Sequence, residues 1–167
     1  SGVRIGVPRL AMANRQEFDP VHALFDSAIA KLAAAGATII DPCDLPSAEQ
    51  LRDAVSCVFA TEFKASLNAF LADNDNPCGI SSLADLITWN EEHREAMPYG
   101  QSLMERSEQT GGLDDPQYLF DRRRDLMLSR TAGIDAALEI GRADVLIAPM
   151  GAAAKCTGKA GAPTLAI

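Results

Sequence analysis

Short apolar runs mark both ends of the chain, and stretches with helical spacing of apolar residues lie between them. Near the start, Val3–Val7 and Thr38–Asp41 are β-prone runs. Between them, apolar positions recur every three to four residues after Asp19, a good N-cap residue, with Pro20 in the first helical position and Gly36 placed as a C-cap. This pattern predicts a strand–helix–strand unit with parallel strands and a right-handed crossover.

The middle of the chain has helical periodicity without the alternation of strands. The sequence predicts a helix Ala48–Ala72 capped by Ser47, a helix through Asn90 with Ser82 and Asp85 as a capping box, a short helical piece Met97–Glu108, and a long helix from Asp115-Pro116 to about Ile140 that Gly141 ends.

The last 25 residues predict a strand, a loop of small residues and a second strand. Val145–Ile147 is apolar without alternation, which is typical of a strand covered on both faces. Pro149 and Gly151 end this strand, and Thr164–Ile167 is the second apolar run. Because chain termini usually lie at the surface, an apolar strand at the end of the chain indicates a sequence cut from a larger protein.

These segments suggest one α/β domain or partial domain. We expect a βαβ unit over residues 1–46, a helical insertion over 47–142 and returning strands over 143–167.

Composition narrows the class of function. The chain has 167 residues, 47% of them hydrophobic, and a formal net charge of −8. Nucleic acids and anionic membranes attract concentrated positive charge, so neither is an expected partner. The basic run Arg122–Arg124 is interpreted as a solvated helix face balanced by Asp121 and Asp125. Neither a membrane-spanning run nor a signal peptide is recognisable, and a cytoplasmic location is expected.

The four cysteines, Cys43, Cys57, Cys78 and Cys156, are far apart in sequence. They form no Cys-x-x-Cys pair, and His22 and His93 have no metal-ligand spacing to them. We therefore expect reduced thiols and no metal site.

Individual residues that could support catalysis have simpler structural explanations. Lys159 follows a glycine, but the spacing of a phosphate-binding loop fails, and no nucleotide cofactor is expected. Ser82 is explained as a helix cap, His93 as a surface residue and Glu62 as a member of an ion pair or polar network. Lys155 lies in the loop after a strand, where α/β proteins bind ligands, but without a partner serine it indicates little.

Five segments together resemble the second half of amidase-signature enzymes, in the order of that family and in its peptide-amidase-like branch. They are the opening VRIGVP with its Asp-Pro-started helix, EFKASLNAFLAD (Glu62–Asp73), SLADLITWNEEH (Ser82–His93), GIDAALEIGRADVLIAP (Gly133–Pro149) and AGAPTLAI (Ala160–Ile167). The resemblance implies an α/β fold, a fragment of an α/β/α sandwich around a mixed, mostly parallel sheet with a helical insertion. It implies hydrolysis of a carboxylic amide to an acid and ammonia or an amine, by two serines and a lysine and without a cofactor.

The motif that carries those catalytic residues, a glycine and serine run of the GGSSGGS kind, is absent from this sequence. No catalytic role transfers to any position here, so we expect the chain to be a C-terminal portion that is inactive alone. The resemblance implies only a substrate-pocket wall, at Met150 and Gly151, with plain loop scaffolding as the alternative. An exposed sheet face or edge would favour a dimer. The rival hypotheses are a non-catalytic α/β module that binds a small molecule or another protein, and a natural pseudoenzyme or assembly subunit.

Overall fold

The structure is a computed structural model that describes residues 2–11, 19–73, 78–149, 151 and 153–165. The chain divides into two compact units, the first made of Ser1–Ala54 and Arg124–Ile167 and the second of Val55–Arg123. Each unit is described by itself below.

Three parallel strands form the sheet of the first unit. They are β1 (Arg4–Gly6), β2 (Thr38–Ile40) and β3 (Val145–Leu146), in the spatial order β2-β1-β3. Ile5 pairs with Ile39 on one side and Val145 on the other. The parallel pairing of the two N-terminal strands confirms the prediction. The strand is covered on both faces, as predicted, since Leu146 packs against the buried cluster on one face and Ile147 against Val7 and Ile29 on the other. Val145 itself is 38% exposed.

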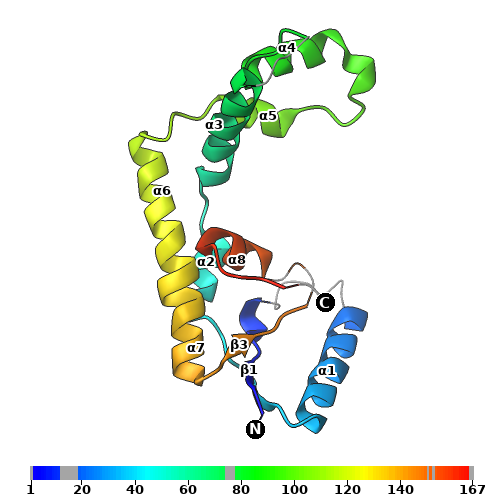
Figure 1. Cartoon of the computed structure of the whole chain (residues 1–167), viewed down its shortest axis with the longest axis vertical. Coiled ribbons are helices and arrows are strands. Elements are labelled where there is room, and N and C mark those ends of the chain that lie inside the picture. Colours follow the sequence, from blue (N-terminus) through cyan, green and yellow to red (C-terminus); the bar gives the residue numbers. More distant parts are fainter. Residues whose placement is uncertain (1, 12–18, 74–77, 150, 152, 166–167) are drawn as a thin grey trace. The chain divides into compact units, whose positions relative to one another are not determined.

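Helix α1 (Asp19–Ala34) connects β1 to β2 and covers one face of the sheet. It begins at the predicted Asp-Pro pair, and Gly36 with a φ of +96° follows its end. Ile29 and Phe25 of α1 pack with Val7, Ile39 and Ile147. In Figure 1 this helix lies on the opposite side of β1 and β3 from α7 (Ala136–Gly141).

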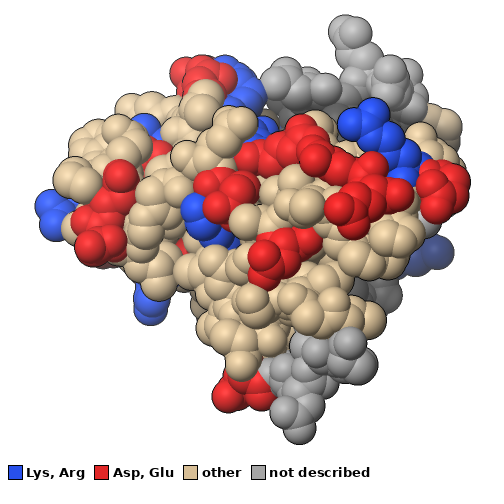
Figure 2. Space-filling view, turned by 90° about the horizontal axis from the view of Figure 1, so that it is seen from above, with Lys and Arg blue, Asp and Glu red and all other residues tan. Residues whose placement is uncertain are grey.

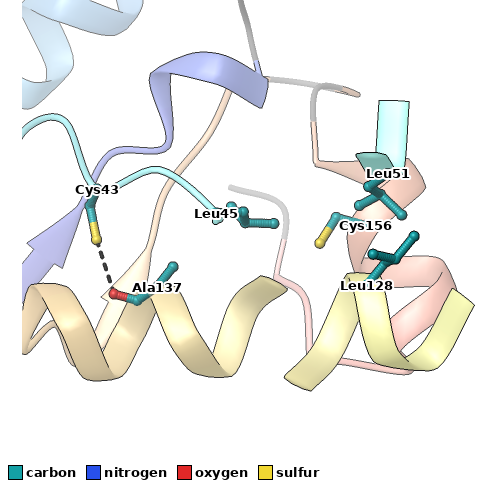
Figure 3. Packing of buried hydrophobic residues seen from close by; sticks show 6 residues of the cluster. All are labelled: Cys43, Leu45, Leu51, Leu128, Ala137 and Cys156. Atoms are coloured by element: carbon teal, nitrogen blue, oxygen red, sulfur yellow. Dashed lines mark hydrogen bonds between the residues drawn. The ribbon is translucent and has the colours of Figure 1, made fainter. Parts of the chain in front are cut away.

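The other face of the sheet holds the larger buried cluster. Figure 3 shows its six members. They come from the segment after β2, helix α2 (Ala48–Asp53), the π-helical segment Met127–Asp135, α7 and α8 (Ala154–Ala160), and they are Cys43, Leu45, Leu51, Leu128, Ala137 and Cys156. Ile40 and Leu146 of the strands pack against this cluster. The first unit therefore has helices on both faces of a parallel sheet, as expected for an α/β fold.

The long helix predicted from residue 115 to about 140 is present but contains an unexpected π-helical segment. It runs as α6 (Pro116–Leu126), the π segment Met127–Asp135 and α7 (Ala136–Gly141). The predicted C-cap at Gly141 is shifted by one residue, because Arg142 adopts the left-handed conformation with a φ of 50°. Gly141 instead allows close packing, since a Cβ there would lie 2.6 Å from Sγ of Cys43.

The prediction of a single helix from Ala48 to Ala72 is wrong, because the chain forms α2 and then a separate helix α3 (Val58–Asp73). Ser56 Oγ accepts from the N–H of Val58, and Asp121 accepts from the N–H of Cys57 at 2.9 Å. These acceptors start a new helix where the apolar period alone suggested continuity. Ser47 does not cap α2 with its side chain; its buried hydroxyl donates to the carbonyl of Leu128.

The second unit is helical. Besides α3 and the first part of α6, it contains α4 (Leu83–Glu92), the 3₁₀ turn Arg94–Ala96 and α5 (Ser102–Glu108). The predicted cap of α4 is confirmed, since Ser82 Oγ accepts from the N–H of Asp85 at 3.1 Å. Helix α5 lies against α3 and α4.

The chain after β3 departs most from the prediction. The expected loop of small residues contains the helix α8, and Ala162–Leu165 are not in a strand. Ala166 and Ile167, the end of the predicted second strand, lie outside the described residues. The local sequence of α8 has no apolar period, and its contacts with the π segment, described below, account for its formation.

Charge on the described surface is mainly acidic. Figure 2 shows larger groups of acidic than of basic side chains on the face drawn.

The interpretation of Asp121 and Asp125 as solvated partners of the basic run Arg122–Arg124 is wrong, because both are buried, at 3% and 1% exposure. Arg122 pairs instead with Glu62 of α3 at 3.3 Å. Among the described helices, none is long and apolar enough to cross a membrane.

Candidate functional site

The carboxyl ends of the three parallel strands meet at one edge of the sheet. From β1 the chain proceeds to β2 on one side, and β3 is later added on the other side of β1. The point between β1 and β3 is therefore where the strand order reverses. Parallel sheets bind ligands outside the carboxyl ends of strands at such a point. This edge is the candidate site of the first unit.

Charged residues follow β1 and β2 at this edge. Arg9 donates from Nε to Asp41 Oδ1 at 2.8 Å and from Nη1 to Asp26 Oδ1 at 2.7 Å, and a second bond from its Nη2 reaches Asp41. The N–H of Leu10 donates to Asp44 Oδ1 at 2.6 Å. The guanidinium of Arg9 thus joins the segments after β1 and β2 to helix α1, and it fixes the backbone next to the strand ends.

The contacts with Arg9 change the pKa of Asp41. Hydrogen bonds from the Arg9 guanidinium hold the pKa of Asp41 below its usual range, and they do so against a smaller opposing effect of burial. Asp41 is therefore ionised near neutral pH, and it holds Arg9 in place rather than serving as a proton donor.

The connection after β3 leaves the sheet at the same edge, next to the end of β1. Gly151 is exposed and has a φ of +75°, a conformation that side-chain-bearing residues rarely adopt. Its carbonyl accepts from the N–H of Ala154 in the first turn of α8 at 3.3 Å. Met150, its companion in the sequence prediction, lies outside the described residues. A pocket wall at Gly151 stays a prediction.

Helix α8 is held against its neighbours by polar contacts. Lys159 forms an ion pair with the buried Asp125 of α6, and Cys156 Sγ donates to the carbonyl of Ser129 at 3.4 Å. Lys155 Nζ donates to the carbonyl of Arg52 at 2.7 Å, at the end of α2. Lys155 is thus a structural residue here, because its ammonium caps a helix end.

Two carbonyl groups of the π segment accept hydrogen bonds from side chains outside it. In such a segment the wider turn displaces carbonyl groups from regular helical bonds. The carbonyls of Leu128 and Ser129 accept from Ser47 and Cys156, respectively. Gly133 lies against this turn, since a Cβ there would come 2.5 Å from the carbonyl oxygen of Leu128. The segment is therefore supported on both sides by the residues that surround it.

Several solved structures have a fold similar to that of this chain. A peptide amidase in complex with the competitive inhibitor chymostatin is 28% identical, with a TM-score of 0.77 over 96% of this chain. Native peptide amidase from Stenotrophomonas maltophilia is 29% identical, with a TM-score of 0.73 over 93%. An amidase family protein from Bacillus anthracis str. Ames has the same fold at 20% identity, with a TM-score of 0.68 over 96% of the chain. No protein-family model matches the sequence, and no curated protein matches it significantly.

The match covers only part of those proteins. The chain spans 35% and 34% of the two peptide amidases and 30% of the Bacillus protein. Its structure matches a portion of peptide amidase, a member of the amidase-signature family. This confirms the resemblance and the α/β fold class inferred from the sequence.

Within this amidase-like portion, the described lysines with side-chain contacts do not bond to serines. Lys159 and Lys64 pair with carboxylates, and Lys155 contacts carbonyls. Ser82 is a helix cap, and Glu62 accepts from Tyr118 at 2.9 Å and pairs with Arg122 in the second unit, as predicted for a polar network. Ser82, Glu62 and these three lysines therefore make structural contacts, and none of the three lysines is paired with a serine among the described residues.

The thiols are also structural. Burial raises the pKa of Cys156 to about 11 and also raises the pKa values of Cys43 and Cys57. None of the four cysteines, all of which lie in the described part of the chain, is in a disulfide. Their reduced state stays a prediction. In the described part of the chain, no group of three His, Cys, Asp or Glu side chains could hold a metal ion.

Sequence reasoning missed Arg9 and Asp41. Arg9 lies alone in a polar connection, and its partners are 17 and 32 residues away. The only available signal was their position directly after two strands that were predicted to be parallel neighbours.

Proposed function

We propose that this chain is the C-terminal portion of an amidase that hydrolyses the C–N bond of carboxylic amides to an acid and ammonia or an amine. The single observation that carries the proposal is the match of 96% of the chain to about a third of a peptide amidase, at 28% identity. In this proposal, the carboxyl edge of the sheet, with Gly151, forms one wall of the amide-binding channel.

We further propose that the chain does not hydrolyse amides alone. Serine hydrolysis of an amide needs a nucleophile, a proton relay and donors for the oxyanion. The Gly/Ser run that would supply these groups is absent from the sequence. The activity would therefore require the rest of a longer protein.

The test compares the 167-residue chain with the longer protein that contains it. Both are incubated with a peptide that ends in a carboxamide, and release of ammonia is followed. We expect turnover only from the longer protein, and loss of that turnover when the central serine of its Gly/Ser run is changed to alanine. Serine-dependent turnover by the 167-residue chain would contradict the proposal that it is inactive alone.

The alternative is a non-catalytic α/β module that binds a small molecule or another protein. It predicts that the longer protein lacks amide turnover on any of a panel of peptide and short-chain amides. It also predicts a monomeric 167-residue chain, whereas an amidase portion with an open sheet edge is expected to dimerise. Size-exclusion chromatography with light scattering measures this difference.

A further inference from the structure

Asp125 is a buried carboxylate, and its partner Lys159 is partly buried. Fold stability does not by itself require such a pair. Their side chains are 2% and 20% exposed, and they form an ion pair between α6 and α8. The attraction in a buried pair is offset by the loss of hydration, so apolar residues of similar volume are often equally stable or more stable there. Such pairs can instead fix one arrangement of the elements that they join.

Helix α8 needs a directional contact of this kind. It has seven residues, and only Cys156 and Ala160 are buried. Small apolar side chains give few shape constraints, so they define the register of a short helix poorly. The ion pair fixes the C-terminal end of α8, while Cys156 and Lys155 fix the rest through carbonyls of the π segment and α2.

The connection between β3 and α8, which contains Gly151, has a backbone hydrogen bond at each end. At one end of the connection, the N–H of Ile147 donates to Gly6 of β1 at 3.0 Å. At the other, the N–H of Ala154 donates to the carbonyl of Gly151 at 3.3 Å. Gly151 lies between these two hydrogen-bonded ends, so we expect a shift of α8 to move its backbone.

We propose that Asp125 and Lys159 are positioning residues, which hold α8 in register and thereby place the Gly151 backbone for amide binding at the carboxyl ends of β1 and β3. This inference rests on the proposed amidase function for its substrate. The pair itself acts through α8 and does not contact the reacting atoms.

The principal experiment uses the longer amidase with the double substitution Asp125→Leu and Lys159→Met. The matched control is Arg130→Met, which removes a cation from an exposed pair on the π segment, at 63% and 60% exposure. We expect the double variant to keep the Tm of the wild type, with kcat/KM lowered about tenfold or more, mainly through KM, because a small displacement of a binding wall weakens substrate positioning. The variant Lys159→Arg, which keeps the cation on a different head group, is expected to have an intermediate KM at unchanged Tm. Arg130→Met is expected to change neither KM nor Tm.

Hydrogen exchange on the 167-residue chain provides a measurement that does not depend on activity. In the double variant, the amides of Ala154 and Thr157 are expected to exchange faster than in the wild type and in Arg130→Met. Unchanged exchange together with unchanged KM would overturn the proposal. If the double variant does not fold, Lys159→Arg decides: an unchanged KM and unchanged exchange of α8 contradict a positioning role.

The two proposals fail in different ways. An inactive wild-type longer protein contradicts the amidase function, and the exchange measurement still decides whether the pair sets the register of α8. An active wild type with unaffected variants leaves the amidase function in place and removes the positioning role.

Discussion

Cys43 occupies the space that the absent side chain of Gly6 leaves free on the sheet. A Cβ at residue 6 would lie 2.7 Å from Sγ of Cys43 and equally close to Cδ2 of Leu146. Cys43 Sγ in turn donates to the carbonyl of Ala137 at 3.3 Å, the contact drawn in Figure 3. Gly6 therefore allows α7 and the segment after β2 to approach the central strand.

The first prediction is that Gly6→Ala destabilises the protein. The added methyl group would have to displace a buried sulfur and a leucine, and such overpacking costs about 1–3 kcal/mol. Urea unfolding would measure the loss. Gly158→Ala is the control: nothing lies within 4 Å of a Cβ there, and an alanine inside a helix is favoured over glycine by roughly 0.5–1 kcal/mol. Equal stability of Gly6→Ala and wild type would show that Cys43 moves aside without cost.

The second prediction concerns acid and the Arg9–Asp41 pair. The pKa of Asp41 is lower in the folded chain than its unfolded value of about 3.9, because Arg9 donates hydrogen bonds to the carboxylate. The stabilisation is therefore fully present above that unfolded value and is lost as the pH falls through the folded pKa. We expect the wild type to lose stability below about pH 4 more steeply than Arg9→Gln.

At neutral pH this pair should contribute up to about 1 kcal/mol, because its side chains are 36% and 28% exposed and solvent screens them. Urea unfolding at several pH values between 7 and 3 gives both quantities. Arg52→Gln, at the exposed Arg52–Asp53 pair, serves as the control and should leave the pH dependence nearly unchanged. Parallel curves for Arg9→Gln and wild type would rule out the linkage.

The parts of the fold that could be predicted from sequence are those with local signals. The βαβ unit has two β-prone runs, an Asp-Pro helix start and a glycine after the helix end, and each agrees with the structure. The cap at Ser82 was recognisable for the same reason, since acceptor and donor are three residues apart.

The parts that were missed depend on residues distant in sequence. Helix α3 starts where it does because Asp121 accepts from Cys57, 64 residues earlier. Helix α8 has no apolar period of its own and is held by Asp125, 34 residues before Lys159. The π segment keeps the periodicity of an α-helix, so nothing in its pattern distinguishes the two. At the candidate site, the sequence was enough to place Gly151 in the loop after a strand. The contacts of Arg9 with Asp26 and Asp41 could not be predicted, because they form only when the segments after β1 and β2 come together in the folded sheet.

The third prediction orders the reactivity of the cysteines. Cys78 is exposed, whereas Cys43 and Cys156 are buried and burial raises both of their pKa values. Only the thiolate reacts with alkylating reagents, so Cys78 should be modified first in the native chain. Cys43 and Cys156 should react only on unfolding. Timed iodoacetamide labelling with peptide mass spectrometry, with and without urea, would show this order. Early modification of Cys156 in native buffer would contradict its placement between α8 and the π segment.

The fourth prediction separates two adjacent serines at the start of α4. Ser82 Oγ accepts from the N–H of Asp85, so Ser82→Ala removes a helix cap and should cost about 1 kcal/mol. Ser81 Oγ instead donates to the Asp85 carboxylate at 2.8 Å, and its hydroxyl is the main reason that the pKa of Asp85 lies below its usual value. Ser81→Ala should therefore raise the pKa of Asp85 toward the ordinary range while the Ser82 cap stays in place. Carboxyl NMR titration of Asp85 and amide exchange in the first turn of α4 measure the two effects independently. If Ser81→Ala frays α4 as much as Ser82→Ala does, the two serines act as one cap and the division of roles is wrong.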